Sequence, residues 1–164
     1  MSVEWVWRKI DVLVAAVFVA GAAIGASQGH AFMTQYQERL SRDLEQARAR
    51  VNEIKTGLRY KLMSDVVRQE LEATAQTRFD RLNIAHTAIA SAGPVLKPYA
   101  LMRHREPQLM AETNDGFVPR VPRDGGGIFY TILGALVGFA VYEILKFPVT
   151  MVARPRQRKF RRRG

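Results

Sequence analysis

Few residues of this 164-residue chain have the types and the spacing that catalysis or metal binding requires. The three histidines, His30, His86 and His104, lie far apart, with no H-x-x-x-H pair and no carboxylate at ligand spacing. There is no cysteine, which excludes disulfides, thiolate metal sites and a cysteine nucleophile. Ser27 and Ser91 lack a G-x-S-x-G setting, and the chain has no Walker loop. We therefore expect no catalytic residue, no metal site, no cofactor and no enzymatic activity.

His30 is the one histidine with a second interpretation. It follows a glycine- and alanine-rich apolar stretch, at the depth expected for a membrane interface. A single histidine at that depth could hold a haem or a pigment, whereas helix ends of this composition often carry a histidine without a ligand. We favour the second interpretation and keep a cofactor contact at His30 as the alternative.

Glycines recur at helical spacing in two apolar segments. Gly21, Gly25 and Gly29 are spaced i, i+4, i+8, and Gly134 and Gly138 are spaced i, i+4. Small residues at this spacing let helix backbones approach closely, so that van der Waals contact replaces the hydrophobic drive that lipid removes. We predict antiparallel packing, with Gly21 and Gly25 at about the depth of Gly134 and Gly138. The alternative is that glycine is simply frequent in membrane helices.

The first glycine-bearing segment reaches the length of a membrane span. Residues 12–26 form an unbroken apolar run, which becomes long enough to cross a bilayer when it is extended to Met33. Trp5 and Trp7 form an aromatic belt at its other end. We predict a transmembrane helix over residues 1–33. The alternative is a cleaved secretory signal, because small residues follow the apolar core.

The second segment is the stronger candidate span. Its apolar run covers residues 128–145 and contains one carboxylate, Glu143. Lys146 follows three residues later on the same helical face, and pairing with it would lower the cost of placing a carboxylate near lipid. We predict a transmembrane helix over residues 125–149, with a Glu143–Lys146 pair at the membrane interface.

Positive charge is concentrated after the second span. The chain carries a net charge of +10, of which +7 lies in residues 147–164. Cytoplasmic flanks of membrane spans are enriched in Lys and Arg, so we predict that both termini are cytoplasmic, that residues 34–124 are periplasmic and that residues 150–164 form a basic cytoplasmic tail. We expect the tail to bind anionic lipids rather than nucleic acid, because it directly follows a span and its single aromatic residue, Phe160, offers no stacking platform. The lipid-binding residues of the tail are predicted to be Arg154, Arg156, Arg158, Lys159, Arg161, Arg162 and Arg163.

The middle of the chain carries an apolar stripe with heptad spacing. Its residues are spaced 4, 3, 4, 3, 4, which predicts a long amphipathic helix. Gly93 and Pro94 predict where the helical pattern ends. A stripe on so long a helix needs a cover, which is either the second half of the segment, folded back around Gly57 or Ser64–Asp65, or a partner's helix. We favour core packing and keep a partner-docking role as the alternative. The stripe residues are Leu40, Leu44, Ala47, Val51, Ile54 and Leu58.

Two stretches resemble a proteobacterial family of small inner-membrane proteins that is known only as a domain of unknown function. AFMTQYQERLSRDLEQA, where the first span runs into the amphipathic helix, is similar to the start of that family. EPQLMAETNDGFVPRVPRDGGGIFYTILGALVGFAVY is similar to its acidic-proline stretch, its aromatic-x-Pro-x-Val-Pro entry and its closing span. The resemblance implies two spans joined by a helical periplasmic hairpin, and it supplies no activity and no site residues. The arginine-rich tail departs from the family pattern.

These patterns predict an all-α membrane protein of the bacterial inner membrane, with two antiparallel transmembrane helices joined by a long helical periplasmic segment, hairpin or coiled-coil-like. We expect a non-catalytic accessory or assembly subunit of a larger integral-membrane complex, respiratory or photosynthetic. Its binding surfaces would be the glycine faces of the spans and the amphipathic helix. The alternative is a self-assembling, homo-oligomeric scaffold in which the heptads of several copies pair.

Overall fold

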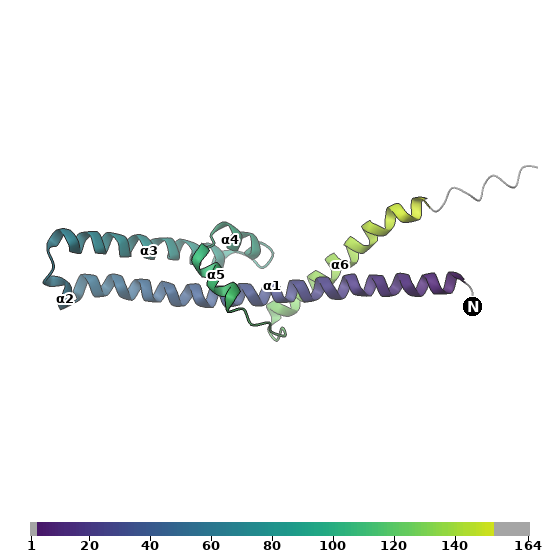
Figure 1. Cartoon of the computed structure of the whole chain (residues 1–164), viewed down its shortest axis with the longest axis horizontal. Coiled ribbons are helices and arrows are strands. Elements are labelled where there is room, and N and C mark those ends of the chain that lie inside the picture. Colours follow the sequence, from purple (N-terminus) through teal and green to yellow (C-terminus); the bar gives the residue numbers. More distant parts are fainter. Residues whose placement is uncertain (1–2, 153–164) are drawn as a thin grey trace, which may run out of the picture. The chain divides into compact units, whose positions relative to one another are not determined.

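The computed structural model describes residues 3–152, and the side chains of all of these except residues 3, 4, 58, 59 and 148–152. Within that range every regular element is an α-helix, as the sequence predicted (Figure 1). The helices form two compact units, which we call the apolar unit (Met1–His30 with Arg120–Gly164) and the hairpin unit (Ala31–Pro119). The helices are α1 (Val3–Thr56), α2 (Leu58–Lys61), α3 (Asp65–Ser91), α4 (Lys97–Arg103), α5 (Pro107–Asp115) and α6 (Gly125–Val152).

Two helices, α1 and α6, are long and apolar enough to cross a membrane by length and composition. In the most apolar window of each helix, only 6% of the α1 residues and 22% of the α6 residues are buried within the structure. A helix in the core of a soluble protein buries its apolar stripe against its own chain. The apolar surfaces of α1 and α6 are instead left largely exposed by the residues that the structure describes.

Helix α1 continues without a break from the apolar residues into the heptad stripe. Its 54 residues correspond to a length of about 81 Å at 1.5 Å per residue. The helix stops at Gly57, whose ψ of 129° is extended and whose N–H still donates to the carbonyl of Glu53 at 2.7 Å. A Cβ at Gly57 would lie 2.5 Å from that same carbonyl oxygen, so the turn requires glycine.

The chain reverses between Gly57 and Ser64, and α3 then lies beside the second half of α1 (Figure 1). Two ion pairs join the helices, Lys55–Glu72 at 3.5 Å and Asp43–Arg78 at 3.8 Å. Four stripe residues are buried and one is half-buried, so the stripe packs within the chain and needs no partner's helix to cover it. The buried residues are Leu40, Ala47, Val51 and Ile54, the half-buried one is Leu44, and the side chain of Leu58 lies outside the description.

Helices α4 and α5 complete the core of the hairpin unit. Helix α3 ends at Ser91, just before the Gly93–Pro94 stop that the sequence predicted. Leu101 of α4 and Leu109 of α5 are buried, together with Tyr36 of α1, which is fully buried. The Tyr36 hydroxyl accepts a hydrogen bond from the backbone N–H of Glu106 at 2.9 Å, and burial raises the pKa of this phenol.

The segment after α5 has no regular secondary structure, and a side chain of α1 satisfies part of its backbone. The amide group of Gln35 donates to the carbonyl of Val118 at 2.8 Å and accepts from the N–H of the same residue at 3.2 Å. Phe117 packs against Phe32 with ring centroids 5.8 Å apart. Gln35 therefore fixes the position of the chain as it leaves the hairpin unit.

Candidate functional site in the apolar unit

In the apolar unit, α6 packs antiparallel against the first half of α1 through Gly134 and Gly138. A Cβ at Gly134 would lie 2.5 Å from the carbonyl oxygen of Ala22 and 2.6 Å from the Cβ of Ala26. A Cβ at Gly138 would lie 2.6 Å from the carbonyl oxygen of Phe18 and 2.7 Å from the Cβ of Ala22. The two backbones are thus in contact, which any larger residue at these positions would prevent.

The glycines of α1 are not part of this contact. Ideal Cβ atoms at Gly21, Gly25 and Gly29 would meet no atom within 4 Å. The residues of α1 at this contact are instead Phe18, Ala22 and Ala26. Each alanine follows a glycine by one position and is so rotated by about 100° around the helix. Gly134 and Gly138 therefore lie at about the depth of Gly21 and Gly25, but the contact on α1 is made by the neighbouring alanines, which are small enough for the glycines of α6.

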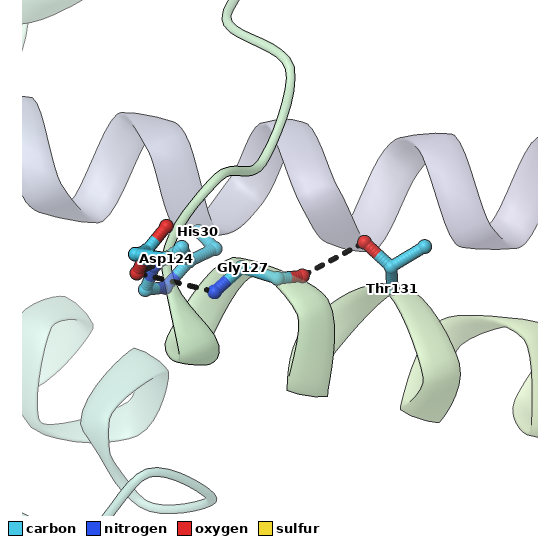
Figure 2. A network of polar contacts seen from close by, with 4 residues as sticks. All are labelled: His30, Asp124, Gly127 and Thr131. Carbon is cyan, nitrogen blue, oxygen red and sulfur yellow. Dashed lines mark hydrogen bonds and ion pairs between the residues drawn. The ribbon is translucent and has the colours of Figure 1, made fainter.

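One end of the helix pair is joined by His30 of α1 and Asp124, the residue before α6 (Figure 2). The His30 Nε2 lies 2.9 Å from the Asp124 Oδ2. The same carboxylate oxygen accepts the N–H of Gly127 at 3.2 Å, as the side chain of an N-cap residue does. The Thr131 hydroxyl donates to the carbonyl of Gly127 at 2.7 Å one turn later. Asp124 therefore caps α6 and ties it to α1.

The glycine run at the start of α6 is where the imidazole sits. A Cβ at Gly126 would lie 2.8 Å from the His30 Cε1, and one at Gly127 would lie 3.3 Å from its Cδ2. The ring also stacks on Tyr130, with centroids 5.0 Å apart and planes inclined by 24°. Gly126 and Gly127 stand at the start of the helix despite their low helix propensity, because a Cβ at either position would crowd this ring, whereas a Cβ at Gly125 would meet no atom within 4 Å.

The contact between His30 and Asp124 changes the electrostatics of the Asp124 carboxylate. The hydrogen bond from the His30 ring is the main reason why the pKa of Asp124 lies below its ordinary value. The side chain of His30 is largely shielded, whereas that of Asp124 is exposed. Among the described residues, no group of three or more His, Cys, Asp or Glu could hold a metal ion. The pair thus fixes the orientation of one ring.

The other end of the helix pair is joined by Asp11 of α1 and two residues of α6. The Lys146 Nζ lies 2.5 Å from the Asp11 Oδ2. The Tyr142 hydroxyl donates to the Asp11 carboxylate, and it also lies 3.1 Å from the Asp11 backbone carbonyl. The sequence led us to expect Glu143 as the partner of Lys146. Glu143 instead lies on the exposed side of α6, and the ion pair forms between helices.

The remaining predicted site residues divide between the hairpin core and the undescribed tail. Four of the six heptad residues are buried in the hairpin unit, as described above. The predicted lipid-binding residues Arg154, Arg156, Arg158, Lys159, Arg161, Arg162 and Arg163 lie outside the described residues. Sequence reasoning missed Asp11 and Asp124. Asp124 could have been found from its position directly before a glycine-led helix, since Asp is a preferred N-cap.

Comparison with known proteins assigns a family and no activity. Residues 58–158 match the family described as "Protein of unknown function (DUF2937)". The match covers the second of the two resembling stretches and leaves out the first, which lies in α1. No curated protein and no solved structure matches the chain.

Proposed function

Because the chain belongs to the DUF2937 family, whose function is unknown, we propose its role from its surfaces: a non-catalytic accessory or assembly subunit of a larger inner-membrane complex. In this proposal α1 and α6 cross the membrane, both termini are cytoplasmic and the hairpin unit is periplasmic. The exposure of both apolar helices supports the membrane location. The placement of Lys and Arg around the two spans supports the orientation.

One surface of the hairpin unit carries the proposal. Four large apolar side chains on α4 and the turn before it are 61–66% exposed, whereas Leu101 on the opposite side of the helix is 3% exposed. We call these four residues the α4 stripe. A cluster of exposed apolar side chains on the aqueous part of a protein marks a contact surface. The α4 stripe consists of Val95, Leu96, Tyr99 and Met102.

The α4 stripe replaces the heptad stripe as the periplasmic docking surface in this proposal. Four of the heptad residues are already buried within the hairpin unit and Leu44 is half-buried, so the described part of the stripe offers little apolar surface. The outward glycine face of α1 supplies a second surface, on which a span of the partner packs closely. The proposed partner is therefore another integral-membrane subunit, which contacts the chain both within the membrane and at α4.

Co-purification in mild detergent tests the proposal. The full-length chain is expected to purify with stoichiometric membrane subunits, and the double variant Tyr99→Asp/Met102→Asp is expected to lose them. The matched control is Leu62→Asp/Val66→Asp, which places the same two charges on residues that are 91% and 75% exposed elsewhere in the hairpin unit. A monodisperse particle that contains only this chain would refute the proposal, as would equal loss of partners in the control.

Self-assembly is the competing outcome of the same test. The chain has no cysteine, so a single cysteine introduced at Met102 reports on this position alone. Symmetric crosslinks between two copies through that cysteine would indicate a homo-oligomeric scaffold. A reporter fused near Arg68 tests the orientation, since cytosolic labelling there would contradict a periplasmic hairpin unit.

A further inference from the structure

A groove lies between α1 and α6 beside the Asp11–Lys146 ion pair. It has a volume of about 630 Å³, within the range of small-molecule sites, and it is open on one side. Its walls are apolar side chains, including Val14 and Phe18 of α1 and Leu145 of α6. These side chains remain substantially exposed although two helices converge around them. The groove is therefore an apolar surface that the chain itself leaves unfilled.

The rim of the groove is positively charged. Arg8 and Lys146 both line it, against the single carboxylate of Asp11. The Asp11 carboxylate already accepts from Lys146 and from the Tyr142 hydroxyl. Arg8 has no hydrogen bond or ion pair with any residue that the structure describes. Among the side chains that the structure describes, no carboxylate pairs with the guanidinium of Arg8, which is thus a cation at the mouth of an apolar groove.

We propose that this groove binds one anionic phospholipid, with an acyl chain against Phe18 and Leu145 and the phosphate on Arg8 and Lys146. The inference rests on the proposed function in two respects, that α1 and α6 cross the membrane and that the ends of these helices beside the groove are cytoplasmic. Basic pockets between membrane helices on the cytoplasmic side are suited to anionic headgroups. A planar guanidinium binds phosphate oxygens in a bidentate manner.

The charge balance selects an anionic lipid over a zwitterionic one. The ammonium group of a zwitterionic headgroup would need a carboxylate, and the Asp11 carboxylate at the groove is already occupied. An anionic headgroup instead meets the uncompensated charge of Arg8. Trp7 also lines the groove, and its ring favours the same headgroup level.

Native mass spectrometry of the full-length chain in neutral detergent tests the site, with phosphatidylglycerol and phosphatidylcholine as probes. The chain is expected to retain one phosphatidylglycerol more tightly than any phosphatidylcholine. Arg8→Gln is expected to weaken that retention about fivefold, from the contribution of one cation near an anionic lipid. The matched control is Lys9→Gln, because Lys9 is the adjacent cation, lies over the ring of Trp5 and does not line the groove.

A second pair of variants tests the apolar part of the groove. Val14→Phe fills the space and is expected to lower the fraction of chains with one retained lipid. Val17→Phe adds the same side chain to an exposed residue of α1 outside the groove and is expected to leave that fraction unchanged. Circular dichroism checks that both variants keep their helices.

The outcomes separate the lipid site from the proposed function. Equal effects of Arg8→Gln and Lys9→Gln would overturn the site in favour of diffuse surface charge. Equal retention of the two lipids would overturn the headgroup contact. Both results leave co-purification with a membrane complex untouched, whereas recovery of the chain from the aqueous fraction without detergent would overturn the membrane location itself.

Discussion

Replacing Gly134 by alanine is expected to separate α6 from α1. The added Cβ would lie 2.5 Å from the carbonyl oxygen of Ala22, about 0.9 Å short of the 3.4 Å at which ordinary contact begins. That oxygen belongs to the backbone of α1, so the helices must move apart rather than a side chain turn aside. A gap of 0.5–1 Å forfeits a quarter to a half of the dispersion energy of the atoms that it separates. We expect a destabilisation of about 1–3 kcal/mol.

Gly21→Ala is the matched control for this change. It has the same effect on helix propensity, a gain of up to about 1 kcal/mol in water, but its Cβ meets no atom within 4 Å. The difference between the two variants therefore isolates the contact between the helices. Gly138→Ala is expected to resemble Gly134→Ala. The double variant should cost less than the sum of the two, because one separation relieves both clashes.

The assay is unfolding of the purified chain in mixed micelles with increasing dodecyl sulfate. The two tryptophans of the chain, Trp5 and Trp7, both lie on α1 and report by fluorescence when α6 leaves. Equal free energies of unfolding for Gly134→Ala and Gly21→Ala would refute the contact. A larger loss for Gly21→Ala would show that the glycine face of α1 is the one that packs within the chain.

Three further predictions concern other contacts of the structure. The hydrogen bond from His30 lowers the pKa of Asp124 in the folded chain below its ordinary value of 3.8. Ionised Asp124 therefore stabilises the start of α6 at any pH above 3.8, and this stabilisation is lost as the pH falls through the lowered pKa of the folded chain. Amide exchange at residues 125–128 should show this pH dependence, and Asp124→Asn should abolish it while keeping the cap. Tyr36→Phe should destabilise the hairpin unit by about 1–3 kcal/mol in chemical denaturation, since the Glu106 N–H loses its acceptor, whereas Tyr99→Phe, at an exposed residue, should not. Ile89→Ala removes a fully buried side chain and should lower the free energy of unfolding by about 2–5 kcal/mol in the same measurement. Ile84→Ala changes an exposed side chain and should lower it by under about 0.5 kcal/mol. Similar values for the two variants would contradict the assignment of Ile89 to the core.

The sequence predicts two of the helix ends, and not the short helices α2, α4 and α5, because those two ends depend on local chemistry. Gly57 ends α1, and Gly93 with Pro94 follows α3, for reasons of backbone geometry that neighbouring residues determine. The heptad spacing likewise identifies residues that become buried, such as Leu40 and Ile54.

The contacts within the apolar unit could not be predicted in the same way. Two faces of α1 carry small residues, one with Gly25 and one with Ala22, and periodicity does not distinguish which of them meets α6. Asp11 and Lys146 are 135 residues apart, so no local spacing rule joins them. The charge of Asp11 inside an apolar segment indicates that it needs a partner. That this partner is Lys146 can be inferred only when the antiparallel register of α1 and α6 is known.

In its contact with Val118, Gln35 binds main-chain atoms alone. The contact therefore depends on where the backbone of the segment after α5 runs and not on its side chains. Its amide binds both the N–H and the carbonyl of Val118, whose own side chain is exposed. Almost any amino acid at residue 118 would offer the same two atoms, with proline excepted because it has no N–H. Insertion or deletion of one residue between α5 and this point would shift both atoms out of reach. The contact is thus sensitive to the number of residues between α5 and Val118 and insensitive to which residues they are.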